Sequence, residues 1–207
     1  KEPLRKRADW DANQKRDLTM PPAPEPLPVA VVDSHCHLDI HDGELYLETS
    51  EALRLAAEAG IDRVVQIGVD LASSRWSVEC ANSHDKVLAT VALHPNEAPR
   101  IFEQQGRAAL EAAWDEIAEL GRDARVRGIG ETGLDYFRTG PDGLAVQAES
   151  FRRHIDIAKQ LNKALIIHDR DAHDDVVKVL LEEGAPEKVV FHCFSGDAKL
   201  AQTAAEH

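Results

Sequence analysis

The sequence predicts an α/β protein whose strands are parallel and belong to a (β/α)8 barrel. From residue 29 onward, short β-branched or apolar runs alternate with amphipathic stretches, which is the pattern of repeated βα units. Six units of about 30 residues each can be counted, and eight such units would reach the size of about 250 residues that is typical of this barrel. We therefore expect a barrel truncated after the sixth βα unit. The alternative is an open doubly wound α/β sheet, which would be complete at this length.

The six expected strands are short and almost continuously hydrophobic, as strands are when helices cover both faces of the sheet. They are expected at residues 29–33, 63–68, 87–93, 126–130, 164–168 and 188–194.

Helices are expected in the stretches between these strands. The clearest spans 143–161, where Leu144, Ala148, Phe151 and Ile155 recur at spacings of three and four residues. Helices over 71–81 and 172–183 follow Asp70 and Asp171, two side chains that suit the N-cap position. Residues 197–207 read as the beginning of a sixth helix.

Residues 1–28 differ in composition from the rest and predict a proline-rich, flexible N-terminal arm. Six of the ten prolines lie in this segment, which has almost no periodic apolar pattern. We expect residues 29–207 to form the barrel domain, without units seven and eight, and the arm to be dispensable for chemistry.

Composition restricts where the protein acts and on what. No run of about 18 apolar residues is present to span a membrane, and no secretory signal follows the basic N-terminus. The three cysteines are too few and odd in number for a disulfide framework, so a reducing, cytoplasmic location is expected. A net charge of −13 argues against a broad basic face for duplex DNA, but a metal site can supply positive charge locally.

Histidines and one carboxylate gather at the carboxyl ends of the expected strands. These ends converge on one face of a parallel barrel, the face on which active sites are built. The residues concerned are His35 and His37 after the first strand, His94 after the third, Glu131 after the fourth, His168 after the fifth and His192 near the end of the sixth.

The pair His35 and His37 has a spacing that suits a metal. Side chains alternate along a strand, so both imidazoles point to one side and Cys36 points to the other. Together with Glu131, His168 and His192, the pair predicts a metal centre in which a carboxylate bridges two divalent ions. By the same alternation Cys36 and Cys193 face away from the barrel interior and are expected to be small buried side chains.

Several other polar residues near the strand ends suit a phosphodiester substrate. Arg138 and Arg170 follow strand ends and could clamp a phosphate, although a surface ion pair is an equal alternative for each. Asp135 shares strand parity with Glu131, which favours a role in supporting a ligand or contacting the substrate. By contrast His154 falls in an expected helix without convergent partners, and we expect it at the surface or at a helix cap.

Five motifs in this order resemble those of the TatD-family metal-dependent deoxyribonucleases, and the resemblance covers about residues 29–207. They are VDSHCHLD at 32–39, LHP at 93–95, GIGETGLDY at 128–136, IHDRDAH at 167–173 and FHCFSG at 191–196. The resemblance implies a TIM-like barrel of the metal-dependent hydrolase superfamily, with a two-metal site and DNA as substrate.

Carried over position by position, the resemblance also implies roles for individual residues. It places His35 and His37 on one ion, His168 and His192 on the other, and Glu131 between the two. His94 is implied near the substrate phosphate or the leaving oxygen. The family's Thr-Asp segment after the eighth strand, whose Asp binds metal and orients the attacking water, is absent from these 207 residues.

The expected function is therefore a divalent-metal-dependent deoxyribonuclease, acting from an end or on single strands, with no stable protein partner evident. Four imidazoles favour Zn, Mn, Fe or Co over Mg, while phosphoryl chemistry and a bridging carboxylate are compatible with Mg or Mn. One alternative keeps the site but cleaves an amide or an ester, including the ester of aminoacyl-tRNA. Another is a non-catalytic module that merely retains the site. Many amide-cleaving relatives use a carboxylated Lys as the bridge, and Glu131 at this position favours the phosphodiesterase.

Overall fold

The computed structural model describes residues 5–6, 20–41 and 47–206. Its centre is a six-stranded parallel sheet in the order β2-β4-β5-β6-β7-β8. The strands are β2 (Val31–Cys36), β4 (Ile61–Ile67), β5 (Val87–Val91), β6 (Val126–Asp135), β7 (Ala164–Arg170) and β8 (Val189–Phe191). This spatial order follows the sequence with no reversal, whereas a doubly wound sheet reverses direction at a switch point. The expected barrel topology is confirmed, as a half-barrel of six βα units.

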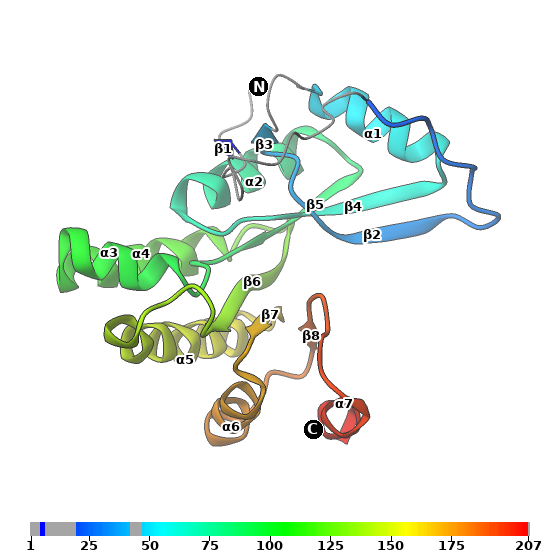
Figure 1. The fold of residues 1–207 in the computed structure, drawn as a ribbon. Helices are drawn as coiled ribbons and strands as arrows, with labels where there is room; N and C mark the ends of the chain where they lie inside the picture. The colour runs from blue at the N-terminus through cyan, green and yellow to red at the C-terminus, as the bar shows by residue number, and fades with distance from the viewer. Residues whose placement is uncertain (1–4, 7–19, 42–46, 207) are drawn as a thin grey trace, which may run out of the picture.

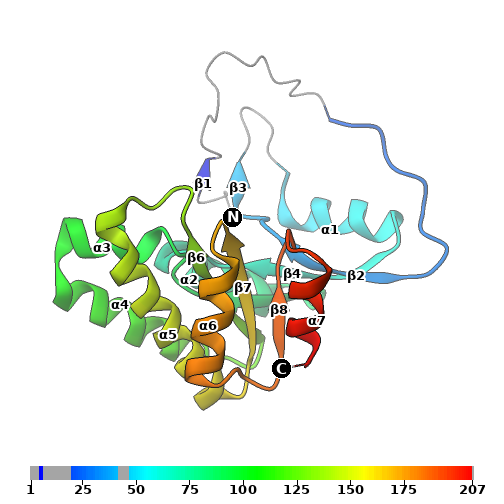
Figure 2. The same cartoon turned by 60° about the horizontal axis from the view of Figure 1, so that its bottom comes forward.

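Helices cover the outer side of the curved sheet, as Figure 1 shows. They are α1 (Thr49–Glu58), α2 (Leu71–Ser83), α3 (Glu97–Gln105), α4 (Arg107–Leu120), α5 (Leu144–Leu161), α6 (His173–Glu183) and α7 (Ala198–Glu206), with a short 3-10 turn at Pro141–Gly143. The third unit contains two helices, α3 and α4, which are joined at Gly106 with a φ of 83°. Figure 2 shows the same arrangement with β7 and β8 brought forward.

The hydrophobic core lies between the sheet and these helices. Its largest fully buried side chains include Phe151 and Ile155 of α5, packed in one cluster with Ile129 and Leu165 of the sheet. The periodic apolar residues expected at 143–161 are thus the face that α5 turns to the strands. Trp114 of α4 is also buried in this cluster.

Two helix starts test the expected N-caps. Asp70 caps α2 as expected, because its side chain accepts a hydrogen bond from the Ser73 amide at 2.7 Å. The expected cap of α6 is wrong: the helix begins at His173 and its N-cap residue is Ala172. Asp171 instead adopts a left-handed conformation with a φ of 57°, so the chain turns there before the helix begins.

Two strand ends differ from the expected ones in a way that matters for the site. β6 continues to Asp135, so Glu131 lies within the strand, because pairing with β7 resumes beyond a register shift and extends to Arg170. Close approach of the two strands requires glycine at Gly133, where a Cβ would lie 2.0 Å from the carbonyl oxygen of His168. β8 ends at Phe191, so His192 follows the strand.

Three minor expectations about burial can also be checked. Cys36 is half-buried, but Cys193 is exposed, which is contrary to expectation. The backbone at Cys193 has a φ of 47° and has already left the strand, so strand parity no longer fixes where its side chain points. His154 is fully buried within α5, and the expectation of a surface position was wrong.

The N-terminal arm falls largely outside the described residues, and residues 20–28 are exposed without regular structure. A two-residue strand, β1 (Arg5–Lys6), pairs in parallel with β3 (Ile40–His41), which follows β2. No helix among the described residues is long and apolar enough to cross a membrane.

Candidate metal centre

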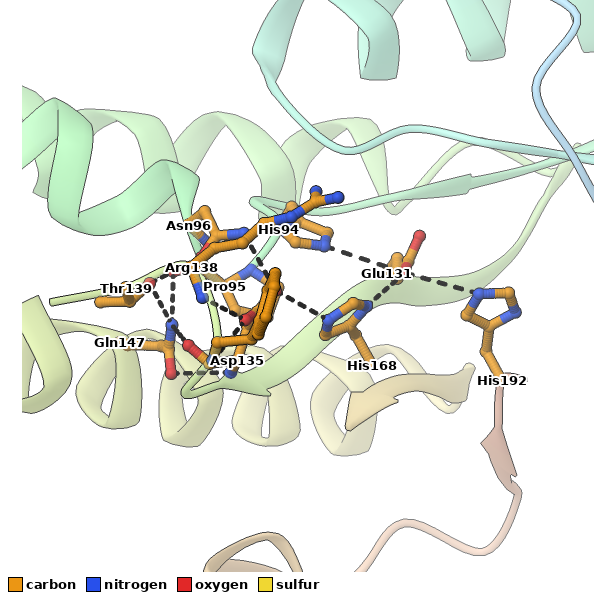
Figure 3. A network of polar contacts seen from close by, with 11 residues as sticks. His94, Pro95, Asn96, Glu131, Asp135, Arg138, Thr139, Gln147, His168 and His192 are labelled. Carbon is orange, nitrogen blue, oxygen red and sulfur yellow. Dashed lines mark hydrogen bonds and ion pairs between the residues drawn. The ribbon is translucent and has the colours of Figure 1, made fainter. Parts of the chain in front are cut away.

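Glu131 lies at the centre of a group of imidazoles at the carboxyl ends of the strands. Its side chain is 7% exposed, and its Oε1 lies 2.7 Å from Nδ1 of His168 and 3.7 Å from Nε2 of His192. His35 approaches the other oxygen, with Nε2 at 3.5 Å from Oε2. Figure 3 shows Glu131 of β6 between His168 and His192, which come from two later units.

The ligand atoms fall into two clusters that share Glu131. One contains His35, Glu131 and His192, and the other contains His94, Glu131 and His168; within each cluster the atoms lie within 4.8 Å of one another. The expected convergence of the first, fourth, fifth and sixth units is therefore present. His94 joins the second cluster, with Nε2 at 3.9 Å from Oε1 of Glu131.

His37 lies beside these clusters rather than in them. Its ring centroid is 5.1 Å from that of His35, and the two rings are nearly perpendicular. The ring of His35 is also stacked on that of His192, at 3.5 Å between centroids. The His-x-His pair therefore reaches the same end of the barrel as expected, but only His35 belongs to a cluster that could share one ion.

The residues present fit a divalent metal. Both ring nitrogens of His35 are buried without a hydrogen-bond partner, and buried polar atoms normally have one. Imidazole nitrogens with a carboxylate form a donor set that suits Zn, Mn and related divalent ions. An ion bound to one of the two ring nitrogens of His35 would give that nitrogen a partner.

The local electrostatics keep the donor atoms in their metal-binding forms. Burial opposes ionisation of Glu131, but the hydrogen bond with His168 at 2.7 Å and the nearby rings of His35 and His94 outweigh it and hold the pKa of this carboxyl below its usual range. Burial lowers the pKa of His94 to about 4 and also lowers that of His192. At neutral pH the site thus presents the Glu131 carboxylate and neutral imidazoles at His94 and His192.

Asp135 contacts His168 through the ring nitrogen that does not face Glu131. It is fully buried, and its Oδ2 lies 3.2 Å from Nε2 of His168, so that this imidazole stands between two carboxylates. Oδ1 of Asp135 accepts hydrogen bonds from the amides of Phe137 and Arg138. Asp135 thereby orients a candidate ligand and shapes the loop that follows β6.

Gln147 of α5 connects this loop to the one that carries His94 (Figure 3). It is fully buried; its Oε1 accepts a hydrogen bond from the Asp135 amide at 2.9 Å, and its Nε2 donates to Thr139 Oγ1 at 2.7 Å and to the Pro95 carbonyl at 3.3 Å. Asn96 completes the network, because its Nδ2 donates to Asp135 Oδ2 at 3.2 Å. No local pattern in the sequence singles out Gln147.

Gln66 holds the loop after β2 in a similar way. Its Oε1 accepts a hydrogen bond from the Leu38 amide at 2.6 Å, and its Nε2 donates to Asp39 Oδ1 at 2.8 Å. Both Gln66 and Asp39 are fully buried. Gln66 is the polar residue within the apolar run at 64–67, a visible signal in the sequence that had not been singled out.

The two arginines expected near substrate occupy different environments. Arg170 places its guanidinium over the ring of Phe137, 4.0 Å from the centroid. Arg138 is exposed, and its positive charge contributes to lowering the pKa of His94. Both lie on the side of the molecule to which the strand ends point.

A parallel half-barrel with half-buried histidines and a buried carboxylate at its strand ends defines an α/β-barrel protein with a candidate metal centre. The comparisons with known proteins give the family. The model of the family described as TatD related DNase matches residues 32–207, and the chain belongs to this family.

Relatives named as metal-dependent hydrolases match most of the chain. The uncharacterized metal-dependent hydrolase TatD of Mycobacterium tuberculosis is 42% identical over 177 residues, which are 84% of this chain and 64% of the relative. The uncharacterized metal-dependent hydrolase YabD of Bacillus subtilis is 36% identical, over 82% of this chain and 63% of the relative. The chain thus spans slightly less than two thirds of the length of these relatives.

Solved structures have the same fold. The crystal structure of YjjV, a TatD homologue from Escherichia coli K12, superposes with a TM-score of 0.71 at 25% identity, over 84% of this chain and 64% of that one. A hydrolase of the TatD family from Entamoeba histolytica gives a TM-score of 0.65 at 22% identity, over 80% and 56% of the two chains, and is evidence for the fold alone.

Proposed function

We propose that the protein is a divalent-metal-dependent phosphodiesterase that hydrolyses DNA. The observation that carries this proposal is the pair of ligand clusters that share Glu131. A carboxylate common to two sets of imidazoles suits a site for two ions. The family description as a TatD related DNase supports DNA as the substrate.

Glu131 would lie between the two ions, with His35 and His192 on one side of it and His168 on the other. His37, whose ring centroid is 5.1 Å from that of His35, is proposed as a further ligand on the side of His35. Two divalent ions in such a site activate water and stabilise the oxygens of an in-line displacement at phosphorus. The identity of the ions is open among Zn, Mn and Mg on the chemistry of the donors.

His94 has a geometry that suits contact with the substrate. Its Nδ1 accepts a hydrogen bond from the Asn96 amide at 3.2 Å, so the neutral ring carries its proton on Nε2. Nε2 is the nitrogen that faces Glu131, and from there it can donate to a phosphate or leaving oxygen. Arg170 and Asp135 lie at the same end of the barrel. Arg170 would attract the negatively charged substrate, and Asp135 holds His168 in position.

Glu131 as the bridge also supports a phosphodiester over an amide substrate. Many amide-cleaving members of the superfamily use a carboxylated Lys on the fourth strand as the bridge. The fourth strand of this sheet, β6, presents Glu131 instead.

The proposal is tested by metal analysis and hydrolysis assays on the chain extended to the length of its relatives. We expect about two ions per molecule and chelator-sensitive cleavage of single-stranded DNA and of a small phosphodiester. Cleavage of an amide or of an aminoacyl ester with no cleavage of any phosphodiester would favour the alternative hydrolase. Metal binding without turnover of either class would indicate a non-catalytic module.

A further inference from the structure

The loop after β6 is hydrogen-bonded to the fifth βα unit, beside the metal centre. The Tyr136 amide, just after β6, donates a hydrogen bond to the Arg170 carbonyl at the end of β7, at 2.9 Å. The hydroxyl of Tyr136 donates to Oδ2 of Asp175 in the first turn of α6, at 2.7 Å. The loop after β6 is therefore held on the end of the fifth βα unit through both its backbone and a side chain.

Phe137 follows in this loop and presents its ring to solvent. The side chain is 57% exposed, although the backbone is anchored by the hydrogen bond from the Phe137 amide to Asp135 at 3.0 Å. The guanidinium of Arg170 lies over the ring at 4.0 Å from the centroid, a distance at which a cation is attracted to an aromatic face. The ring is thus held in place while much of it stays accessible.

The stacked pair of Phe137 and Arg170 lies next to the candidate metal centre. Arg170 is two residues beyond His168 in β7, so the two side chains leave the strand on the same face, with Cα atoms about 7 Å apart. Phe137 is two residues beyond Asp135, which contacts His168. A chain of nucleotides with one phosphate at the centre would bring a neighbouring base to this pair.

We propose that Phe137 and Arg170 form a nucleobase subsite for single-stranded DNA. The inference rests on the proposed phosphodiesterase function and adds how the strand is held. The open part of the Phe137 ring takes a base by stacking, and Arg170 fixes the ring and places a positive charge beside the adjoining phosphate. Because every base has a π-face, the subsite is tolerant of sequence. It favours single strands over duplexes, in which neighbouring base pairs already cover both faces of a base.

The subsite is tested by the binding of two strands of equal length and charge, a short oligothymidylate and a strand of abasic residues. Binding is followed by fluorescence anisotropy on the chain extended to the length of its relatives, with its metal retained and with both strands built on phosphorothioate linkages that resist cleavage. Phe137→Ala is expected to weaken binding of the oligothymidylate about 5- to 150-fold, the effect of losing one base–aromatic stack, and to change binding of the abasic strand much less. Phe137→Trp is expected to keep the preference for bases.

Leu181→Ala is the matched control. Leu181 is 53% exposed, and it lies in the last turn of α6, the end that faces away from the carboxyl ends of the strands. This variant is expected to bind both strands as the wild-type protein does. The proposal is overturned if Phe137→Ala keeps the wild-type preference for bases, if it weakens both strands equally, or if the wild-type protein shows no preference. Because nothing is hydrolysed in this experiment, failure of the proposed phosphodiesterase activity would be seen separately.

Discussion

At the scale of single residues, burial decides which ionisable groups can serve the centre. Glu131 is nearly inaccessible yet stays ionised, because His168 is hydrogen-bonded to it and the rings of His35 and His94 lie within 4 Å of its oxygens. The same burial keeps His94 and His192 neutral, which is the form that binds metals and accepts or donates hydrogen bonds. The acidity of the protein as a whole says little about this centre, whose properties come from a few contacts.

Glu131→Gln is expected to abolish metal-dependent DNA hydrolysis in the chain extended to the length of its relatives and to leave the fold intact. The change removes the negative charge shared by both clusters but almost no volume. Metal content and the rate of cleavage of single-stranded DNA are measured together, with circular dichroism as the control for folding. Hydrolysis at the wild-type rate would show that Glu131 is not the bridge.

His154 makes a second prediction at this scale, about pH and stability. Its Nε2 accepts a hydrogen bond from the Leu93 amide at 3.0 Å, next to His94, and its Nδ1 lies 2.6 Å from the Ser150 carbonyl. Burial lowers the pKa of His154 to about 4. The unfolded chain, with a His pKa of about 6.5, then binds more protons than the folded chain between these two values. The free energy of unfolding therefore falls as pH drops through this window, by about 3 kcal/mol in full.

The free energy of unfolding is measured with denaturant at pH 7 and pH 4.5 in the chain extended to the length of its relatives, for the wild-type sequence and for His154→Gln. The Gln side chain can still accept from the Leu93 amide but does not titrate. We expect the variant to lose clearly less stability between the two pH values than the wild-type chain does. Equal losses would mean that His154 is not the group that titrates.

At the scale of elements, α5 both packs on the sheet and positions two loops of the candidate site. Its apolar face packs on the strands as its periodicity predicts, while Gln147 on the same helix binds the loops that follow β5 and β6. One helix thus fixes the relative position of His94 and Asp135, which come from different units. Strands β6 and β7 are positioned by backbone pairing with each other, which continues to Asp135 and Arg170.

Gln147→Leu is expected to destabilise the chain by about 2–4 kcal/mol, because the buried amide of Asp135 and the Thr139 hydroxyl lose partners at once. Gln160→Leu is the control, since Gln160 lies exposed on the same helix and is expected to change stability by no more than about 0.5 kcal/mol. Both are measured by chemical denaturation of the chain extended to the length of its relatives. Similar values for the two variants would contradict the role assigned to the network.

At the scale of the whole molecule, the six described units form a sheet with two edges rather than a closed barrel. β2 and β8 are the outermost strands of the described sheet. Val32 of β2 is 53% exposed and Val190 of β8 is 44% exposed. Unpaired strand edges with exposed apolar side chains invite pairing with another chain.

The isolated 207-residue chain is therefore expected to associate or to unfold without a cooperative transition. A chain extended by about 60 residues, which is two further units, is expected to be monomeric and at least 10²-fold more active, because the general-base contribution of a carboxylate after the eighth strand is commonly of this size. Analytical ultracentrifugation and thermal unfolding, together with a DNA cleavage assay, make the comparison. A monomeric 207-residue chain with a cooperative transition and the same activity would show that the half-barrel is sufficient.

The sequence by itself determined the number and order of the βα units and the end of the sheet at which the histidines meet. Alternation and helical periodicity are local properties, and parallel strands bring their carboxyl ends to one edge whatever the packing. Only the tertiary structure decided how the loops are held, because Gln66, Gln147 and His154 act on segments distant in the sequence. It also placed Glu131 inside β6 and grouped His35 with His192 rather than with His37. The pairing of β6 with β7 and the path of the chain after each strand depend on neighbouring segments, which no local sequence pattern encodes.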